Sequence, residues 1–202
     1  MLVPAGALFS GIFLKHLIMF NLIEHLETYV AVDTQEEERR RRFLDFVRTQ
    51  PDGLSRKLEV GHLTASTWLL SPNRQAVLLT HHRKLNRWLQ LGGHADGEPD
   101  LAAVALREAH EESGIAKIYL LSDQIFDLDI HHIPAGRGVK AHLHYDVRFL
   151  AQADSWQFKK NTESYELRWF NPGEIAAVST EESLLRMERK WVRLSQPSVL
   201  SL

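Results

Sequence analysis

Three glutamates on one short segment are the residues of this sequence best placed to do chemistry. Glu108, Glu111 and Glu112 stand within five consecutive positions. On a helix, which turns about 100° per residue, their side chains share one narrow face. Solvated like charges at this spacing cost about 0.2–0.5 kcal/mol per pair, and more when they are partly buried. A divalent cation that prefers oxygen ligands, Mg²⁺ or Mn²⁺, offsets this repulsion, so the cluster predicts a metal site.

The chain around the glutamates predicts a strand, a glycine loop and then a helix. "RWLQLGG" is typical of a short strand that runs into Gly92 and Gly93, and glycine lets a backbone approach a ligand closely. The helix is predicted over residues 98–113, with Pro99 in its first turn and Gly114 as its stop signal.

The opposite side of this helix carries small and apolar residues that suit close packing on a sheet: Ala102, Leu106 and Ala109. His110 points the same way, which indicates a packing or capped histidine. The alternative to a metal site is a solvated acidic helix face. The glycine loop in front of the helix favours the metal site over that alternative.

Composition limits the classes of function. The 202 residues suffice for one domain with a sizeable core and an added arm. The net charge of -2 and the pI near 6.6 disfavour a nucleic-acid-binding protein. The absence of cysteine excludes disulfides, thiolate metal sites and thiol nucleophiles, and it fits a reducing cytoplasm.

Patterning along the chain predicts an α+β fold with a mixed β-sheet and an N-terminal helical arm. Helices are expected at residues 20–32, 34–49 and about 180–194, the second capped by Thr34. Strands are expected within residues 62–93 (a hairpin and a shorter strand), 118–131, 141–152 and 165–170. The domains are then residues 1–57, an extension and helical arm, and residues 58–197.

The first 18 residues are apolar but interrupted by Lys15 and His16, short of the ~20 residues that a membrane span needs. We expect them to pack on the domain as an extension, with a peripheral anchor as the alternative. The run of arginines at residues 39–42 follows a run of glutamates, which indicates a solvated helix face with ion pairs.

"GGHADGEPDLAAVALREAHEESGI" resembles the signature of the Nudix hydrolases. In that signature a glycine and a later glutamate precede Arg-Glu, an apolar residue, any residue, Glu-Glu, any residue and a glycine. The second half fits completely over residues 107–115. In the first half the glutamate stands one position early, at Glu98 instead of residue 99. Asp96 or Asp100 is the alternative partner for Arg107.

The resemblance implies an α/β/α sandwich that hydrolyses a diphosphate linked to another group, often a nucleoside. It also implies Mg²⁺ or Mn²⁺ as cofactor. Glu108 would be a metal ligand or the base that activates water, and Arg107 would orient the glutamates. The remaining metal ligands implied are Glu111, Glu112 and the backbone carbonyl of Gly92.

Some members of the family take the catalytic base from a later loop, for which Glu163 is our candidate and Glu166 a weaker one; the alternative is a surface acid. His94 follows the glycines and is a further candidate metal ligand. Alternating residues on two strands predict one-sided polar faces that bind a second metal or substrate phosphates, or that are simply half-exposed: Asp127, Asp129 and His131, and His142, His144 and Asp146.

Arg83 and Lys84 are candidates for contacting substrate phosphates, and Trp88 for stacking on a base or ring. A solvated turn and a core tryptophan are the alternatives. The expected partner is a small phosphorylated, nucleotide-derived substrate, and the arm is a candidate homodimer interface. A competing interpretation is a catalytically silent ligand-binding or regulatory module of the same fold.

Overall fold

The computed structural model describes residues 22–136 and 138–195. Close backbone contacts divide the chain into two compact units. Unit 1 contains the chain up to Ala65, Gly93–Val104 and Asp123–Arg148, and unit 2 contains Ser66–Gly92, Ala105–Ser122 and the chain from Phe149 on. The predicted extension of residues 1–18 lies outside the described residues. Among those described, no helix has the length and apolarity needed to cross a membrane.

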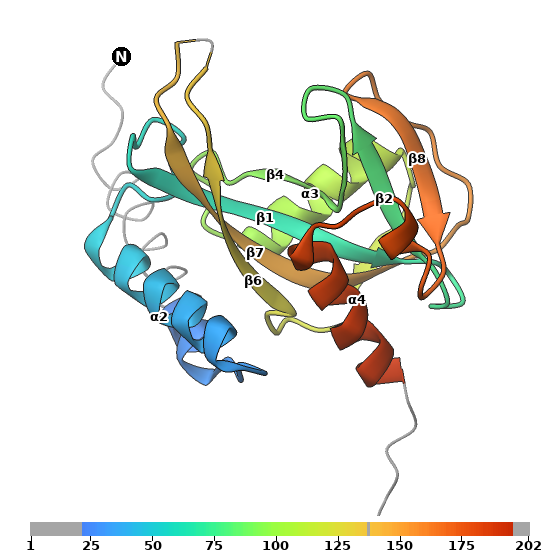
Figure 1. Ribbon diagram of the computed structural model, residues 1–202, viewed down its shortest axis with the longest axis horizontal. Helices are drawn as coiled ribbons and strands as arrows, with labels where there is room; N and C mark the ends of the chain where they lie inside the picture. Colours follow the sequence, from blue (N-terminus) through green and yellow to red (C-terminus); the bar gives the residue numbers. More distant parts are fainter. Residues whose placement is uncertain (1–21, 137, 196–202) are drawn as a thin grey trace, which may run out of the picture. The chain divides into compact units, whose positions relative to one another are not determined.

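The elements confirm the predicted α+β class (Figure 1). Eight strands are hydrogen-bonded into one sheet. In chain order the elements are α2 (Thr34–Thr49), β1 (Gly61–Leu70), β2 (Val77–His82), β3 (Arg87–Leu89), β4 (Leu91–His94), α3 (Leu101–Ser113), β5 (Ile118–Leu120), β6 (Asp127–Ile133), β7 (His142–Ala153), β8 (Ser164–Phe170), the short 3₁₀ helix η1 (Ile175–Ala177) and α4 (Glu182–Ser195).

In unit 1, helix α2 packs against β6, the strand that pairs antiparallel with β7 (Figure 1). Two phenylalanines of α2 make the contact with the sheet: Phe43 meets the ring of Tyr145 edge-on at 5.3 Å, and Phe46 stacks on it at 3.9 Å between centroids. The N-cap is Asp33 and not Thr34, because the Asp33 carboxylate accepts the Glu36 backbone N–H at 2.8 Å.

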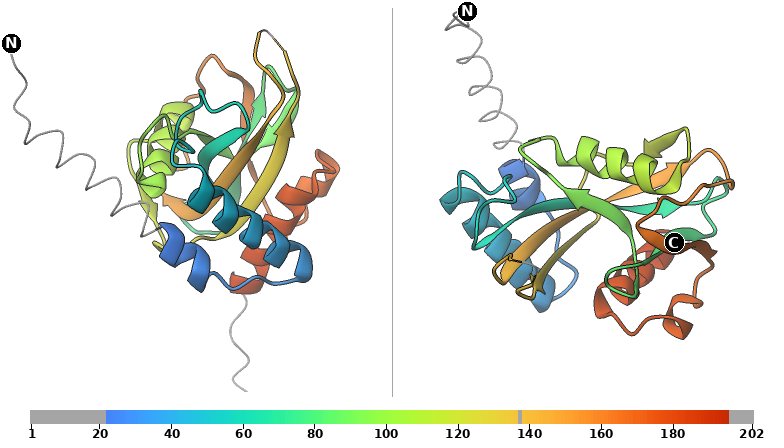
Figure 2. Two further views of the ribbon diagram at one scale, coloured as in Figure 1. Left: turned by 90° about the vertical axis from the view of Figure 1, so that its left-hand side faces the viewer. Right: turned by 90° about the horizontal axis from the view of Figure 1, so that it is seen from above.

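Residues 22–28 are helical and lie beside α2 (Figure 2). Arg40 joins the two helices by donating to the Leu26 carbonyl at 3.2 Å. Glu37 pairs with both Arg40 and Arg41, which confirms that the arginine run forms ion pairs along its own helix.

A buried ion cluster ties β6 to β7 in unit 1. Arg148 is 2% exposed, and its guanidinium contacts three carboxylates: Asp146 at 2.8 Å, Asp127 at 3.1 Å and Asp129 at 3.2 Å. Thr64 on β1 donates to the other oxygen of Asp146 at 2.9 Å. The cluster favours this register of the two strands, because it brings all three carboxylates to the one guanidinium.

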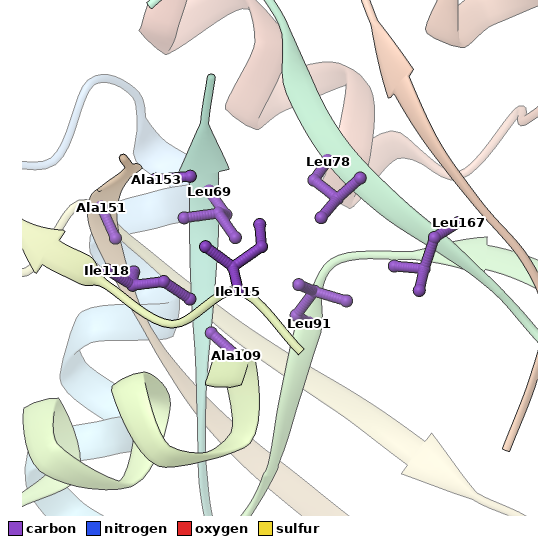
Figure 3. Close-up of a cluster of buried hydrophobic side chains, with 9 residues drawn as sticks. All are labelled: Leu69, Leu78, Leu91, Ala109, Ile115, Ile118, Ala151, Ala153 and Leu167. Atoms are coloured by element: carbon purple, nitrogen blue, oxygen red, sulfur yellow. The ribbon is translucent and has the colours of Figure 1, made fainter. Parts of the chain in front are cut away.

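In unit 2, β1 and β2 form the predicted hairpin, with Leu69 opposite Leu78, and β2 also pairs with β3 and β8. The core of the unit consists of nine buried apolar side chains from these strands, α3 and its flanking segments (Figure 3): Leu69, Leu78, Leu91, Ala109, Ile115, Ile118, Ala151, Ala153 and Leu167. Ala109 gives this core one face of α3.

Replacing Arg148 with Met tests whether the ion cluster holds the strands. The substitution removes the guanidinium from the buried Asp127 and Asp146 and from the partly buried Asp129. We therefore expect a loss of about 3–5 kcal/mol in the free energy of unfolding, measured in urea. The matched control is Arg41→Met, which breaks a surface pair whose arginine is 68% exposed and is expected to lose less than about 1 kcal/mol. Similar stabilities for the two variants would contradict the assignment.

Candidate functional site

Helix α3 presents the three glutamates, and local signals set both of its ends. It begins at Leu101, three residues later than predicted, because the Asp100 carboxylate caps it by accepting the Ala103 N–H at 3.0 Å. Pro99 therefore precedes the helix. At the other end Gly114 has φ +63° and donates to the His110 carbonyl at 2.8 Å, which confirms the predicted stop.

The helix faces differ in part from the prediction. Its fully buried stripe runs through Val104, Ala105 and Ala109, whereas Ala102 and Leu106 are only half-buried. His110 was predicted to be a packing or a capped histidine. It is capped, because its Nδ1 lies 2.8 Å from the Ile115 carbonyl oxygen.

The three glutamates share a helix face but not an environment. The side chain of Glu111 is 63% exposed, that of Glu108 is 19% exposed, and Glu112 is only 8% exposed as a residue. The Oε2 atom of Glu112 is buried and has no hydrogen-bond partner among the described residues. A buried carboxylate oxygen without a partner costs free energy, so this atom is available to coordinate a metal ion.

Burial, together with the nearby charges of Glu108 and Glu163, raises the pKa of Glu112 to about 8. A hydrogen bond from the Gly92 backbone acts in the opposite direction, and Glu111 adds a smaller upward effect. The groups that shift this pKa are therefore residues predicted to form the metal site, namely Gly92, Glu108 and Glu111, and the predicted base, Glu163. They form one electrostatic cluster within unit 2, and a bound cation would stabilise its ionised form.

Arg107 pairs with the glutamates of its own helix. Its guanidinium donates to Glu108 at 2.8 Å and lies 3.8 Å from the Glu111 carboxylate. Both alternative partners are engaged elsewhere: Asp100 caps α3 and Asp96 pairs with Arg56. The early glutamate, Glu98, accepts the Asp100 N–H at 3.0 Å and so braces the turn before the helix.

Of the two later acids, Glu163 has the stronger link to the cluster. Its carboxylate influences the pKa of Glu112, and its backbone carbonyl accepts the Arg83 N–H at 2.8 Å. This hydrogen bond anchors the loop before β8 to the end of β2. Glu166 is exposed and lies opposite His81 in the β2–β8 pairing.

The three candidate substrate-contacting residues take different positions in unit 2. Arg83 and Lys84 are exposed in the turn after β2, where the Arg83 guanidinium lies 5.1 Å from the Tyr165 ring centre. Trp88 is 9% exposed and stacks on His81 at 5.2 Å. It also lines a cavity of about 460 Å³ together with polar residues of β3 and the segment before α4, including Arg87, Thr180 and Glu181. Glu108, Glu111 and Glu112 do not line this cavity.

In unit 1, the register of β6 and β7 places His131 opposite His144 and Asp129 opposite Asp146. The aspartates at the alternating positions of β6 and β7 contact Arg148. The histidines at these positions instead lie close to one another. His94, predicted as a metal ligand, packs its ring 5.0 Å from that of His144.

His62 was not identified from the sequence, although its ring lies near three of the other histidine rings. Its ring lies 4.7–5.1 Å from the rings of His94, His142 and His144. Burial lowers the pKa of His62 to about 4 and that of His144 to about 2, with the neighbouring histidines adding to both shifts. The signal available in the sequence was a histidine at the start of the strand-like run of residues 62–70.

A NUDIX domain family model matches residues 61–192. Similar solved structures include a C. elegans Ap4A hydrolase binary complex, with 17% identity over 65% of this chain and 96% of that chain and a TM-score of 0.53. Another is the M. smegmatis Nudix hydrolase RenU, with 23% identity over 68% and 89% and a TM-score of 0.50. A third is the NUDIX domain of Shewanella oneidensis NrtR complexed with ADP ribose, with 16% identity over 75% and 97% and a TM-score of 0.51. The search of curated proteins found no match.

The raised pKa of Glu112 predicts a pH-dependent cost in the metal-free protein. The folded chain keeps this proton up to about pH 8, whereas the unfolded chain loses it near 4.5, the ordinary pKa of a glutamate. Between these values the folded state binds more protons, so stability falls as pH rises. Glu112→Gln removes the effect, and we expect it to be more stable than wild type by about 1–3 kcal/mol at alkaline pH, with a smaller gain in acid.

Thermal unfolding in EDTA at several pH values measures the difference. Glu111→Gln is the control, because its carboxylate is largely exposed and its neutralisation is expected to change stability much less. A Glu112→Gln variant that is no more stable than wild type at about pH 8 would show that this carboxylate is not held in a costly environment.

Proposed function

Because the chain belongs to the Nudix family, we propose that it hydrolyses the diphosphate linkage of a nucleoside diphosphate joined to another group, with Mg²⁺ or Mn²⁺ as cofactor. The observation that carries the proposal is the buried, unpartnered Oε2 of Glu112 within a group of acidic side chains. A helix that needed only a solvated acidic face would not bury one of its carboxylates.

The residues present fit a hard divalent cation. Glu108, Glu111 and Glu112 offer carboxylate oxygens, and Gly92 brings backbone within hydrogen-bonding reach of Glu112. These residues would hold the ion, with the Gly92 carbonyl as an additional ligand. Arg107 already pairs with two of the glutamates, so it orients them.

Hydrolysis of a diphosphate is slow because the negative charge of the substrate repels a nucleophile. When bound, the cation reduces that charge and makes a nearby water more acidic. The protein's part is to position the water and accept its proton. Glu108 is 19% exposed and paired with Arg107, and Glu163 lies on a loop anchored through its backbone, so we propose Glu163 as the base and Glu108 as a ligand.

The turn after β2 and the cavity beside Trp88 are proposed to receive the rest of the substrate. Arg83 and Lys84 present exposed cations that suit phosphate oxygens. The cavity volume of about 460 Å³ lies in the range of small-ligand sites, and Trp88 supplies it with an aromatic wall. A cytoplasmic location and dimerisation through the arm of residues 1–57 belong to the same proposal.

A catalytically silent binding module is the second candidate. One neighbour, the NUDIX domain of NrtR, was solved complexed with ADP ribose, so the fold holds such a ligand in that protein. Catalysis is favoured because the sequence has all three glutamates of the second half of the signature and because Oε2 of Glu112 lacks a partner among the described residues. Binding of a nucleotide without turnover would support the silent module.

Glu112→Gln is expected to reduce hydrolysis by about a hundredfold or more, because it removes a charged oxygen from the metal site. The assay follows phosphate-containing products from ADP-ribose, Ap4A, nucleotide sugars and nucleoside triphosphates with Mg²⁺ or Mn²⁺. Glu38→Gln, the same change at an exposed position of α2, is the matched control and should retain full activity. Equal activity of both variants would remove Glu112 from the site.

Glu163→Gln separates the base from the ligands. If Glu163 accepts the proton, kcat falls by about 10²–10⁴-fold, the acid limb of the pH–rate profile is lost, and Mn²⁺ affinity is retained. Glu166→Gln, on the same sheet edge, should change kcat by less than about threefold. A pH profile of Glu163→Gln identical to that of wild type would instead assign the base role to Glu108.

A further inference from the structure

Three histidines from two strands of unit 1 bring their ring nitrogens together. His62 lies on β1, and His142 and His144 lie on β7. One nitrogen from each ring falls within 4.8 Å of the others. The three residues belong to neither the glutamate cluster nor the cavity beside Trp88, and the proposed hydrolysis makes no use of them.

The spacing of two of these nitrogens matches metal coordination. The Nε2 atoms of His142 and His144 are 3.3 Å apart. With metal–nitrogen bonds of ~2.0–2.1 Å, tetrahedral geometry separates two ligand nitrogens by about 3.3–3.4 Å. The third ring needs to approach by about 1.5 Å or less, which is within the reach of a side-chain rotation.

A backbone hydrogen bond sets the tautomer of His142. Its Nδ1 lies 2.8 Å from the Lys140 carbonyl, and a carbonyl can only accept, so Nδ1 carries the proton. Nε2 therefore presents its lone pair to the cluster. A ring N–H held by a backbone carbonyl is the usual outer support of a metal-bound histidine.

His62 is the residue that the protein alone does not satisfy. It is 3% exposed, and neither of its ring nitrogens makes a well-formed hydrogen bond to a described residue; only a weak interaction with the Leu58 backbone favours its protonated form. Leaving such a group unpaired costs about 1–3 kcal/mol. A hydrogen bond between His142 and His144 explains their proximity but not the buried position of His62.

The donor set points to a transition metal. Carboxylates are absent from the group of three, and the nearby aspartates Asp127, Asp129 and Asp146 are bound to Arg148. Imidazole suits Zn²⁺, Ni²⁺, Cu²⁺ and Fe²⁺, whereas Mg²⁺ takes oxygen ligands. A metal binds the neutral form of imidazole.

We propose that His62, His142 and His144 bind one divalent transition-metal ion, of the Zn²⁺ type, at a site separate in residues and chemistry from the glutamate cluster. Three protein ligands leave one coordination position open. The rings of His94 and His131 border the site, at 5.0 and 5.2 Å from the ring of His144.

The test is Zn²⁺ titration of the full chain, stripped of metal by EDTA, in a calorimeter. Glu108→Gln/Glu112→Gln serves as the background, because it removes the carboxylates that would also take up the ion. We expect one Zn²⁺ per chain, bound at least about tenfold more weakly when His142→Ala is added. His132→Ala is the matched control: it removes an exposed histidine from the neighbouring strand and should leave affinity unchanged.

X-ray absorption of the Zn²⁺-loaded wild-type chain, in the presence of excess Mg²⁺, covers the case in which a variant fails to fold. Scattering from imidazole rings supports the proposal, and a shell of oxygen atoms alone overturns it. No Zn²⁺ uptake, or uptake that His142→Ala does not weaken, also overturns it. None of these results bears on Mg²⁺-dependent hydrolysis, so failure here is distinct from failure of the proposed function.

Discussion

The burial of the Glu112 carboxylate is the constraint on which the proposed active site depends. Helical periodicity places this side chain one turn after Glu108, and the Asp100 cap and Gly114 stop fix the helix that carries it. At 8% exposure the carboxylate cannot turn to bulk water, and its Oε2 has no partner among the described residues. A folded chain retains such a group when something outside the chain satisfies it.

Arg148 shows how the same chain treats a buried charge that serves structure alone. Its guanidinium contacts three aspartates, and Asp146 takes a further hydrogen bond from Thr64. Each of the three carboxylates therefore contacts the guanidinium, although one positive charge balances only one of their three negative charges. Glu112 differs from these aspartates, because its buried Oε2 has no hydrogen-bond partner among the described residues.

Local rules predicted the elements better than they predicted environments. Helical spacing and stop signals predicted α2 and α3, and a turn between two strand-like runs predicted the β1–β2 hairpin. The starts of the helices differed from the prediction by one to three residues, because Asp33 and Asp100 accept the N–H groups of the first turns. Spacing also placed the three glutamates on one face. It did not foresee that Glu111 stays in water while Glu112 is buried, since burial depends on strands distant in sequence. His62 was missed for the same reason, because its partners lie about eighty residues away on β7.

The Oε2 atom of Glu112 and the ring nitrogens of His62 are alike in being buried without a hydrogen-bond partner among the described residues. They belong to donor sets of opposite character. Oxygen donors around Glu112 favour hard ions such as Mg²⁺, which keep several bound waters, and this suits a site that must admit a charged substrate. Imidazole nitrogens around His62 favour ions higher in the Irving–Williams order. A transition metal that is captured by the histidines is thereby withheld from the carboxylates. In the two proposed sites, separating the ligand types would let one small chain use an abundant, weakly bound ion for chemistry and hold a scarcer, more tightly bound ion at different residues.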